Sequence, residues 1–186
     1  MIARGVDAVS CDLLPSESPG PHIQGDILDH LDDGWDALIA FPPCTYLCAS
    51  GARWWRKRQY EQALALLFVR LLLGANIPKI AIENPIGRIS KAIRKPDQII
   101  QPWQFGHGEV KTTCLWLKGL PLLEPTEYAE GREQRCWKES NTKDRWKRRS
   151  RTYIGIAAAM ADQWGKNRYS DALATKAGHP RCRDPE

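Results

Sequence analysis

Cys44 and Glu83 are the residues whose type and position point most directly to chemistry. Cys44 follows an apolar run, residues 37–41, and the two prolines Pro42 and Pro43. Glu83 follows a second apolar run further along the chain. Apolar runs of this length are typical of buried strands, and prolines stop a strand and stiffen the loop after it. If the two strands are parallel neighbours, both side chains lie at one edge of a sheet and form a single site.

The chemistry open to this pair is covalent attack on a pyrimidine. A cysteine thiolate is a strong nucleophile, and C6 of a cytosine ring accepts it when N3 is protonated or hydrogen-bonded. The addition makes C5 nucleophilic enough to take a methyl group. A carboxyl group beside N3 and the exocyclic amine supplies the proton and recognises the base. Cys44 and Glu83 are the residue types that this reaction requires.

The segments DALIAFPPC and IAIENP, which contain Cys44 and Glu83, resemble the DNA cytosine-5 methyltransferase family. In that family the nucleophile lies in a Pro-Cys loop after one strand, and a Glu-Asn pair follows the next. The resemblance implies that Cys44 is the nucleophile, Glu83 reads the cytosine and Asn84 supports the Cys44 loop. It also implies a DNA partner and S-adenosylmethionine as cofactor. Short methylase-like proteins of phages and prophages are the most similar in organisation.

The same resemblance implies cofactor-binding residues. Asp26 matches the aspartate that meets the adenine of S-adenosylmethionine, and Asp12 stands where an acid binds the ribose hydroxyls. Pro42 and Pro43 complete the cofactor-binding set. The family's first strand and its glycine-bearing loop have no counterpart before residue 5, so the resemblance implies an N-terminally truncated fold.

A basic segment points to nucleic acid. Residues 132–151 contain nine Lys or Arg against three acids, together with Trp137 and Trp146. Cations interleaved with aromatic rings suit a phosphate backbone with bases nearby, although a solvated charged loop has the same composition. A further segment, 105–113, is similar to the family's segment for the flipped base and its phosphates. The expected nucleic-acid-binding residues are Lys111, Arg145, Lys147, Arg148 and Arg149.

Strands and helices alternate along the chain, and they must position these residues. Strands are expected over 5–14, 22–27, 37–41, 78–82 and 113–117, and helices over 54–73 and 153–164. This order predicts an α/β fold, class I methyltransferase-like (Rossmann-like), with a mainly parallel sheet flanked by helices. One domain is expected over 1–164, with a basic insert at about 130–151. The tail, 165–186, is expected to be poorly ordered.

Composition excludes several other classes of protein. The most apolar run, 63–75, is too short to span a bilayer and contains Arg70, so no membrane partner is expected. Residues 1–4 lack the apolar middle of a secretory signal, which predicts a cytoplasmic location. The resemblance to phage and prophage proteins implies that the cytoplasm is that of a bacterium or phage-infected host. The six cysteines are irregularly spaced without a CxxC pair, and this pattern predicts neither disulfides nor a metal site.

Several alternatives remain open on the sequence alone. The chain could be a non-catalytic nucleic-acid-binding relative, or a DNA amino-methyltransferase in which Cys44 replaces an aromatic residue of a Pro-Pro loop. Cys48 could replace Cys44 as nucleophile, although packing suits it better, and Glu83 could only cap a helix. Trp54 and Trp55 suit either a loop that covers a flipped base or the first turn of a helix.

Overall fold

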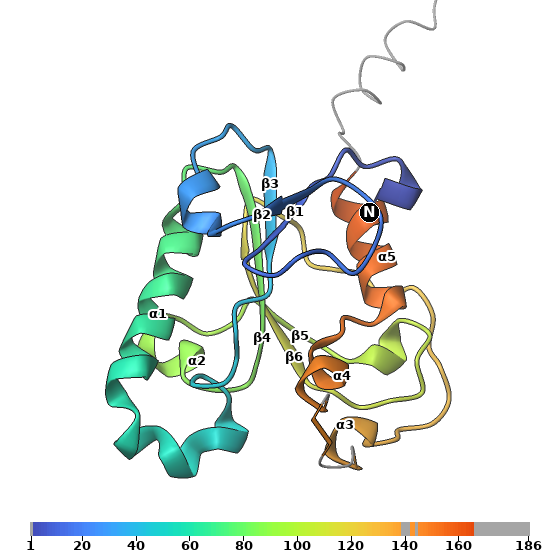
Figure 1. The fold of residues 1–186 in the computed structure, drawn as a ribbon. Coiled ribbons are helices and arrows are strands. Elements are labelled where there is room, and N and C mark those ends of the chain that lie inside the picture. Colours follow the sequence, from blue (N-terminus) through green and yellow to red (C-terminus); the bar gives the residue numbers. More distant parts are fainter. Residues whose placement is uncertain (1, 139–141, 144, 166–186) are drawn as a thin grey trace, which may run out of the picture.

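The structure, a computed structural model, describes residues 2–138, 142–143 and 145–165 (Figure 1). The predicted tail beyond Gly165 therefore lies outside the described residues. The strands are β1 (Ser10–Asp12), β2 (His22–Gln24), β3 (Ala37–Ala40), β4 (Lys79–Pro85), β5 (Gln98–Ile100) and β6 (Thr113–Lys118). The α-helices are α1 (Gln59–Gly74), α2 (Ile89–Ala92), α3 (Arg135–Lys138), α4 (Arg145–Ser150) and α5 (Ile154–Trp164). Short 3₁₀ helices are η1 (Ile2–Arg4), η2 (Ile27–His30), η3 (Ala49–Lys57) and η4 (Pro102–Gln104).

The predicted α/β class is confirmed, but the sheet is mixed rather than mainly parallel. Four strands lie in the order β3-β4-β6-β5, in which β3 is parallel to β4 and β6 is antiparallel to both of its neighbours. The connection between β5 and β6 contains η4 but no α-helix, whereas parallel neighbours are usually joined by a crossover that contains one. Strands β1 and β2 pair in parallel as a separate two-stranded sheet.

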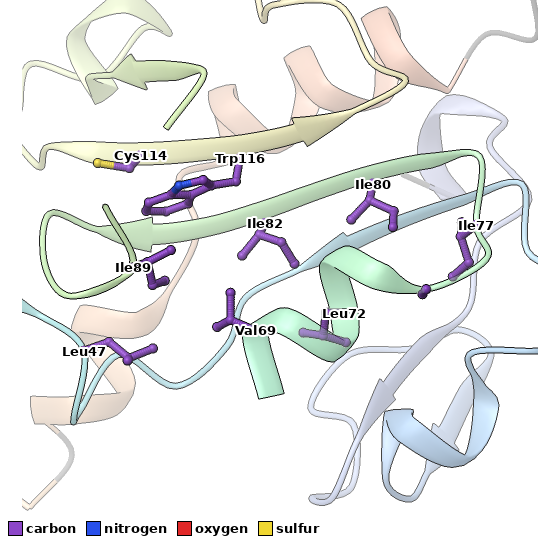
Figure 2. Packing of buried hydrophobic residues seen from close by; sticks show 10 residues of the cluster. Leu47, Val69, Leu72, Ile77, Ile80, Ile82, Ile89, Cys114 and Trp116 are labelled. Atoms are coloured by element: carbon purple, nitrogen blue, oxygen red, sulfur yellow. The ribbon is translucent and has the colours of Figure 1, made fainter. Parts of the chain in front are cut away.

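Two hydrophobic clusters cover the two faces of the four-stranded sheet. Because side chains alternate along a strand, Ile80 and Ile82 of β4 point to one face and Ala81 to the other. Val69 and Leu72 of α1 pack against the first face, where Figure 2 shows them beside the two isoleucines. The second cluster combines Ala81 and Leu115 with Ile156, Met160 and Trp164 of α5. The sheet is therefore a middle layer between α1 and α5 (Figure 1).

The structure corrects the predicted end of one strand and the predicted start of one helix. Strand β4 does not end at Ile82 but continues to Pro85, because Glu83 and Asn84 pair with β6. Glu83 therefore does not cap a helix, and α2 begins only at Ile89. The predicted helix over 54–73 is divided at Arg58, whose φ of −128° and ψ of 42° are not helical. Trp54 and Trp55 consequently belong to η3 rather than to the first turn of α1.

No helix in the described part of the chain combines the length and apolarity needed to cross a membrane. Helix α1 is the longest of them, with 16 residues. Several of its apolar side chains line the core on one side only, and Leu64, Leu67 and Leu71 are exposed. This helix is therefore a surface layer of the domain.

Candidate functional site

The site is built where the parallel strands β3 and β4 end at the same edge of the sheet. Ala40 lies opposite Ile82, so the chain leaves β3 towards Cys44 beside the last residues of β4. In an open α/β sheet this edge, at the carboxyl ends of parallel strands, is where ligands bind. Glu83 is half-buried in this position, and Cys44 is exposed on the loop beyond Pro43. The structure therefore brings Cys44 and Glu83 to the same edge of the sheet.

Asn84 ties the Cys44 loop to β4. Its Nδ2 donates a hydrogen bond of 2.8 Å to the carbonyl oxygen of Pro42, and its side chain is 1% exposed. Its Oδ1 is shielded from solvent and has no hydrogen-bond partner within the described residues. Buried polar groups are normally paired, so this bond fixes the loop at the cost of one unpaired acceptor.

A second connection joins the chain after Cys44 to the chain after β4. The amide of Arg88 donates to the Leu47 carbonyl at 2.8 Å, and the amide of Ala49 donates to the Ile86 carbonyl at 2.9 Å. Gly87 lies between these bonds, and a Cβ at that position would come within 1.9 Å of the Leu47 oxygen. Only glycine allows the two segments to approach so closely. The loop that carries Cys44 is therefore held at both of its ends.

Cys44 and Cys48 differ in accessibility. The carbonyl of Cys44 accepts from the amides of Leu47 and Cys48, at 3.0 and 2.8 Å, so the two cysteines lie one turn apart. Cys44 is exposed, whereas Cys48 is half-buried with its Sγ 3.2 Å from Ser50 Oγ. Both are free thiols, as are Cys11 and the buried Cys114. The accessible thiol beside Glu83 is thus that of Cys44, which agrees with the packing role expected for Cys48.

The positive charge of Lys111 lowers the pKa values of both Glu83 and Cys44, which burial raises. Burial raises the pKa of the Glu83 carboxyl, and the positive charge of Lys111 counteracts this only in part. Partial burial also raises the pKa of the Cys44 thiol, although its surface reaches solvent, and Cys48 and Glu83 raise it further. Lys111 and the thiol's backbone hydrogen bond lower it. Glu83 therefore favours its protonated form more than an ordinary glutamate does, and Lys111 favours the thiolate of Cys44.

The side chain of Lys111 reaches from the β5–β6 connection to α4. Its Nζ donates to the carbonyl oxygen of Arg149 at 3.0 Å and lies 5.8 Å from the centre of the Tyr153 ring. Its amide donates to Gln101 Oε1 at 3.1 Å. Lys111 is therefore positioned by three separate parts of the chain, one of which is the basic segment.

The segment 105–109 packs against the beginning of α5, which sequence analysis did not predict. Tyr153 donates a hydrogen bond of 2.6 Å from its hydroxyl to Glu109, and Gly155 donates from its amide to His107 Nε2 at 3.0 Å. Arg135 pairs with the other oxygen of Glu109 at 2.9 Å. Burial and the Glu109 carboxylate raise the pKa of Tyr153 to about 12, so the hydroxyl keeps its proton. His107 is thus half-buried and hydrogen-bonded to the first turn of α5.

Asp12 ends strand β1 of the separate two-stranded sheet, and Asp26 follows β2 as the N-cap residue of η2. Both are exposed, and each accepts from a nearby amide, Asp12 from Leu14 at 2.9 Å and Asp26 from Leu28 at 3.0 Å. Burial raises the pKa of the Cys11 thiol, and both carboxylates raise it further, so the two acids are near one another. The structure therefore brings the expected cofactor acids together at the end of β1 and β2. Pro42, which is buried, and Pro43, which is exposed, belong instead to the Cys44 loop.

The basic residues of α4 divide into two groups. Arg145 and Arg149 face η3, where they line a cavity together with Arg53 and Ser50. Arg148 is exposed and donates to Thr142 Oγ1 at 2.6 Å. The side chain of Lys147 lies outside what the structure describes. The sequence places Arg53 in a cationic stretch beside Trp54 and Trp55 but does not connect it to this cavity, because that position depends on the approach of a helix about ninety residues later in the chain.

Comparison of the chain with known protein families, with curated proteins and with solved structures finds no significant match. Within the described residues, no group of three or more His, Cys, Asp or Glu side chains is arranged to hold a metal ion. Cys44, Glu83, Asn84 and Lys111 are the residues whose geometry and electrostatics indicate a function.

Proposed function

We propose that the protein is a class I methyltransferase-like DNA cytosine-5 methyltransferase. The observation that carries this proposal is the combination of an exposed cysteine, a glutamate whose pKa is raised by burial, and a lysine that acts on both. The parallel pairing of β3 and β4 supports it, because it brings the Pro-Pro-Cys loop and the Glu-Asn pair to one sheet edge. The substrate is a cytosine taken out of the base stack.

The reaction begins when the Cys44 thiol loses its proton, which the charge of Lys111 favours. The thiolate forms a bond to C6 of the cytosine, and the electrons of the C5–C6 double bond become available at C5. Protonated Glu83 donates to N3 and so stabilises the charge that develops on the ring. After C5 is methylated, loss of its proton restores the double bond, and the bond to Cys44 breaks.

S-adenosylmethionine is the methyl donor in this proposal, and it supplies an activated methyl group when bound. Asp12 and Asp26 fit its nucleoside half, since both are exposed and each ionised carboxylate has acceptor capacity beyond its one amide contact. In the proposal they would bind the ribose hydroxyls and the adenine, and Pro42 and Pro43 would border the donor from the Cys44 loop. The protein's residues then orient the cytosine and control its protons.

Covalent trapping tests the proposal directly. DNA containing 5-fluorocytosine cannot lose a proton from C5, so the bond to Cys44 should persist and appear as an adduct in mass spectrometry. Wild-type protein with S-adenosylmethionine should give the adduct, Cys44→Ser should not, and the matched variant Cys48→Ser should. If no adduct forms on DNA that the protein demonstrably binds, the cytosine-5 mechanism is refuted. Full methylation by Cys44→Ser would instead favour an amino-methyltransferase.

A non-catalytic nucleic-acid-binding relative is the second candidate. It is favoured by the separation of β1 and β2 from the four-stranded sheet. The side chains of Asp12 and Asp26, which lie at the end of these strands, already accept hydrogen bonds from local backbone amides. Isothermal titration with S-adenosylmethionine separates the two candidates. Binding that is lost in Asp26→Asn supports the enzyme, and absence of binding by the wild-type protein supports the relative.

A further inference from the structure

A cavity of about 400 Å³ lies between η3 and α4. Arg145 and Arg149 are four residues apart on α4, so they face it from one side of that helix. Residues of η3 form the opposite wall. The lining residues are Ala49, Ser50, Ala52, Arg53, Arg145 and Arg149.

The lining of this cavity is suited to an anion. Three arginines and one serine line it, and none of its six lining residues is an acid. The Nε of Arg145 is shielded from solvent and has no hydrogen-bond partner among the residues that the structure describes. Like charges that converge repel one another, and a bound anion would relieve the repulsion and would accept from the unpaired Nε of Arg145.

Phosphate is the anion that matches these donors best. Guanidinium groups bind phosphate oxygens in a bidentate, planar geometry, and several of them can share one phosphate. The hydroxyl of Ser50 adds a donor that a purely electrostatic surface would not supply. Arg53 also lies 5.2 Å from the centre of the Trp54 ring, a contact that limits the conformations of its long side chain.

Two chains of contacts connect this cavity to the Cys44 site. On one side, Ser50 contacts the Sγ of Cys48, whose amide donates to the carbonyl of Cys44. On the other side, the carbonyl of Arg149 accepts from Lys111, whose charge acts on Glu83 and Cys44. An anion in the cavity would therefore be next to the base site rather than on a remote surface.

We propose that this cavity binds a phosphate group of the nucleotide whose base reaches Cys44, an inference that rests on the proposed function. The same chemistry is offered by a phosphodiester of a DNA strand and by the phosphate of a free nucleotide. Binding the phosphate beside the base would position the cytosine ring over the thiol and raise the effective concentration of the reacting atoms.

The test measures binding in three single variants that each remove one positive charge. Arg53→Gln and Arg145→Gln remove charges that line the cavity. Arg56→Gln removes an exposed charge from the same 3₁₀ helix outside the cavity lining and is the matched control. The probes are a fluorescently labelled single-stranded oligonucleotide with one cytosine, and deoxycytidine 5′-monophosphate. Thermal melting of each variant establishes that it is folded before binding is compared.

Arg53→Gln and Arg145→Gln should each weaken binding about tenfold and reduce the dependence on salt, whereas Arg56→Gln should change binding much less. If Arg53→Gln and Arg145→Gln weaken binding of the oligonucleotide alone, the ligand of the cavity is a phosphodiester. If they weaken binding of the mononucleotide as well, the cavity also accepts the phosphate of a free nucleotide. Equal losses in all three variants would mean general attraction of a basic surface and would overturn the inference.

The experiment also distinguishes failure of the cavity from failure of the chemistry. If selective loss in Arg53→Gln is found without any 5-fluorocytosine adduct, the phosphate site stands and the methyltransferase mechanism fails. If the adduct forms equally well in wild type, Arg53→Gln and Arg145→Gln at limiting DNA, the phosphate site is refuted and the mechanism stands.

Discussion

Asn84 donates a 2.8 Å hydrogen bond to the carbonyl oxygen of Pro42 and thereby joins strand β4 to the loop that carries Cys44. The bond spans 42 residues of sequence and is buried. It couples the position of the nucleophile to the residue beside Glu83. The neighbouring glutamate and cysteine therefore keep a fixed relation even though Cys44 itself lies on an exposed loop.

Asn84→Ala should loosen this relation. The substitution leaves the Pro42 carbonyl without its donor and removes a buried amide, so we expect a loss of stability of about 1–3 kcal/mol. Formation of the 5-fluorocytosine adduct should slow by more than the loss of folded protein explains. Denaturant unfolding and adduct kinetics measure the two effects. Asn76→Ala, at an exposed loop position, is the control and should leave both unchanged.

Gly87→Ala should separate the chain after Cys44 from the chain after β4, which Gly87 allows to approach closely. The new Cβ would lie 1.9 Å from the Leu47 oxygen, so the backbone must shift and the hydrogen bond from Arg88 must lengthen or break. We expect a lower melting temperature and weaker adduct formation. Gly74→Ala is the matched control, because a Cβ at Gly74 meets no atom within 4 Å. Equal melting temperatures for the two variants would contradict the tight contact.

The local sequence predicts the centre of the site well. Apolar runs before Cys44 and Glu83 indicate buried strands, and a parallel pair necessarily brings their carboxyl ends together. The extension of β4 through Glu83 to Pro85 is not visible in the same way, because it depends on pairing with β6 about thirty residues later. Nothing near Pro85 indicates that pairing, and a proline usually marks a strand's end.

Long-range side-chain contacts are the part of the site that the sequence does not predict. Tyr153 and Glu109 are 44 residues apart and are joined only when α5 packs on the β5–β6 connection. The cavity at Arg53 likewise requires α4 to approach η3. A basic composition indicates an affinity for phosphate, but it does not show which arginines converge. These features depend on tertiary packing rather than on any local pattern.

Glu83 should make stability decrease with rising pH. Burial raises its pKa in the folded protein above the unfolded value of about 4.3, so the folded state keeps the proton that the unfolded state releases. The contribution of the Glu83 carboxyl to the free energy of unfolding is fully present at low pH. It is lost as pH rises from the pKa of the unfolded state through that of the folded state. Denaturant unfolding at a series of pH values should show a smaller decrease for Glu83→Gln than for wild type. Glu61→Gln is a control on α1, and identical curves for Glu83→Gln and wild type would refute the prediction.

Lys111→Gln should make the Cys44 thiol less reactive near neutral pH. Lys111 lowers the pKa of Cys44 against the opposing effects of burial, Cys48 and Glu83, so its removal should shift the pKa upward. Less thiolate is then present at a given pH, and alkylation by iodoacetamide should slow several-fold. Peptide mapping by mass spectrometry follows Cys44 separately from the other thiols.

The pH profile distinguishes this electrostatic effect from a distorted loop. If Lys111 acts through charge, the alkylation rates of wild type and Lys111→Gln should converge once the pH exceeds both thiol pKa values, and Lys111→Arg should restore much of the rate at neutral pH. Lys91→Gln, an exposed position on α2, should follow the wild-type profile. A constant ratio of rates at every pH would show that Lys111 controls access to Cys44 and does not stabilise its thiolate.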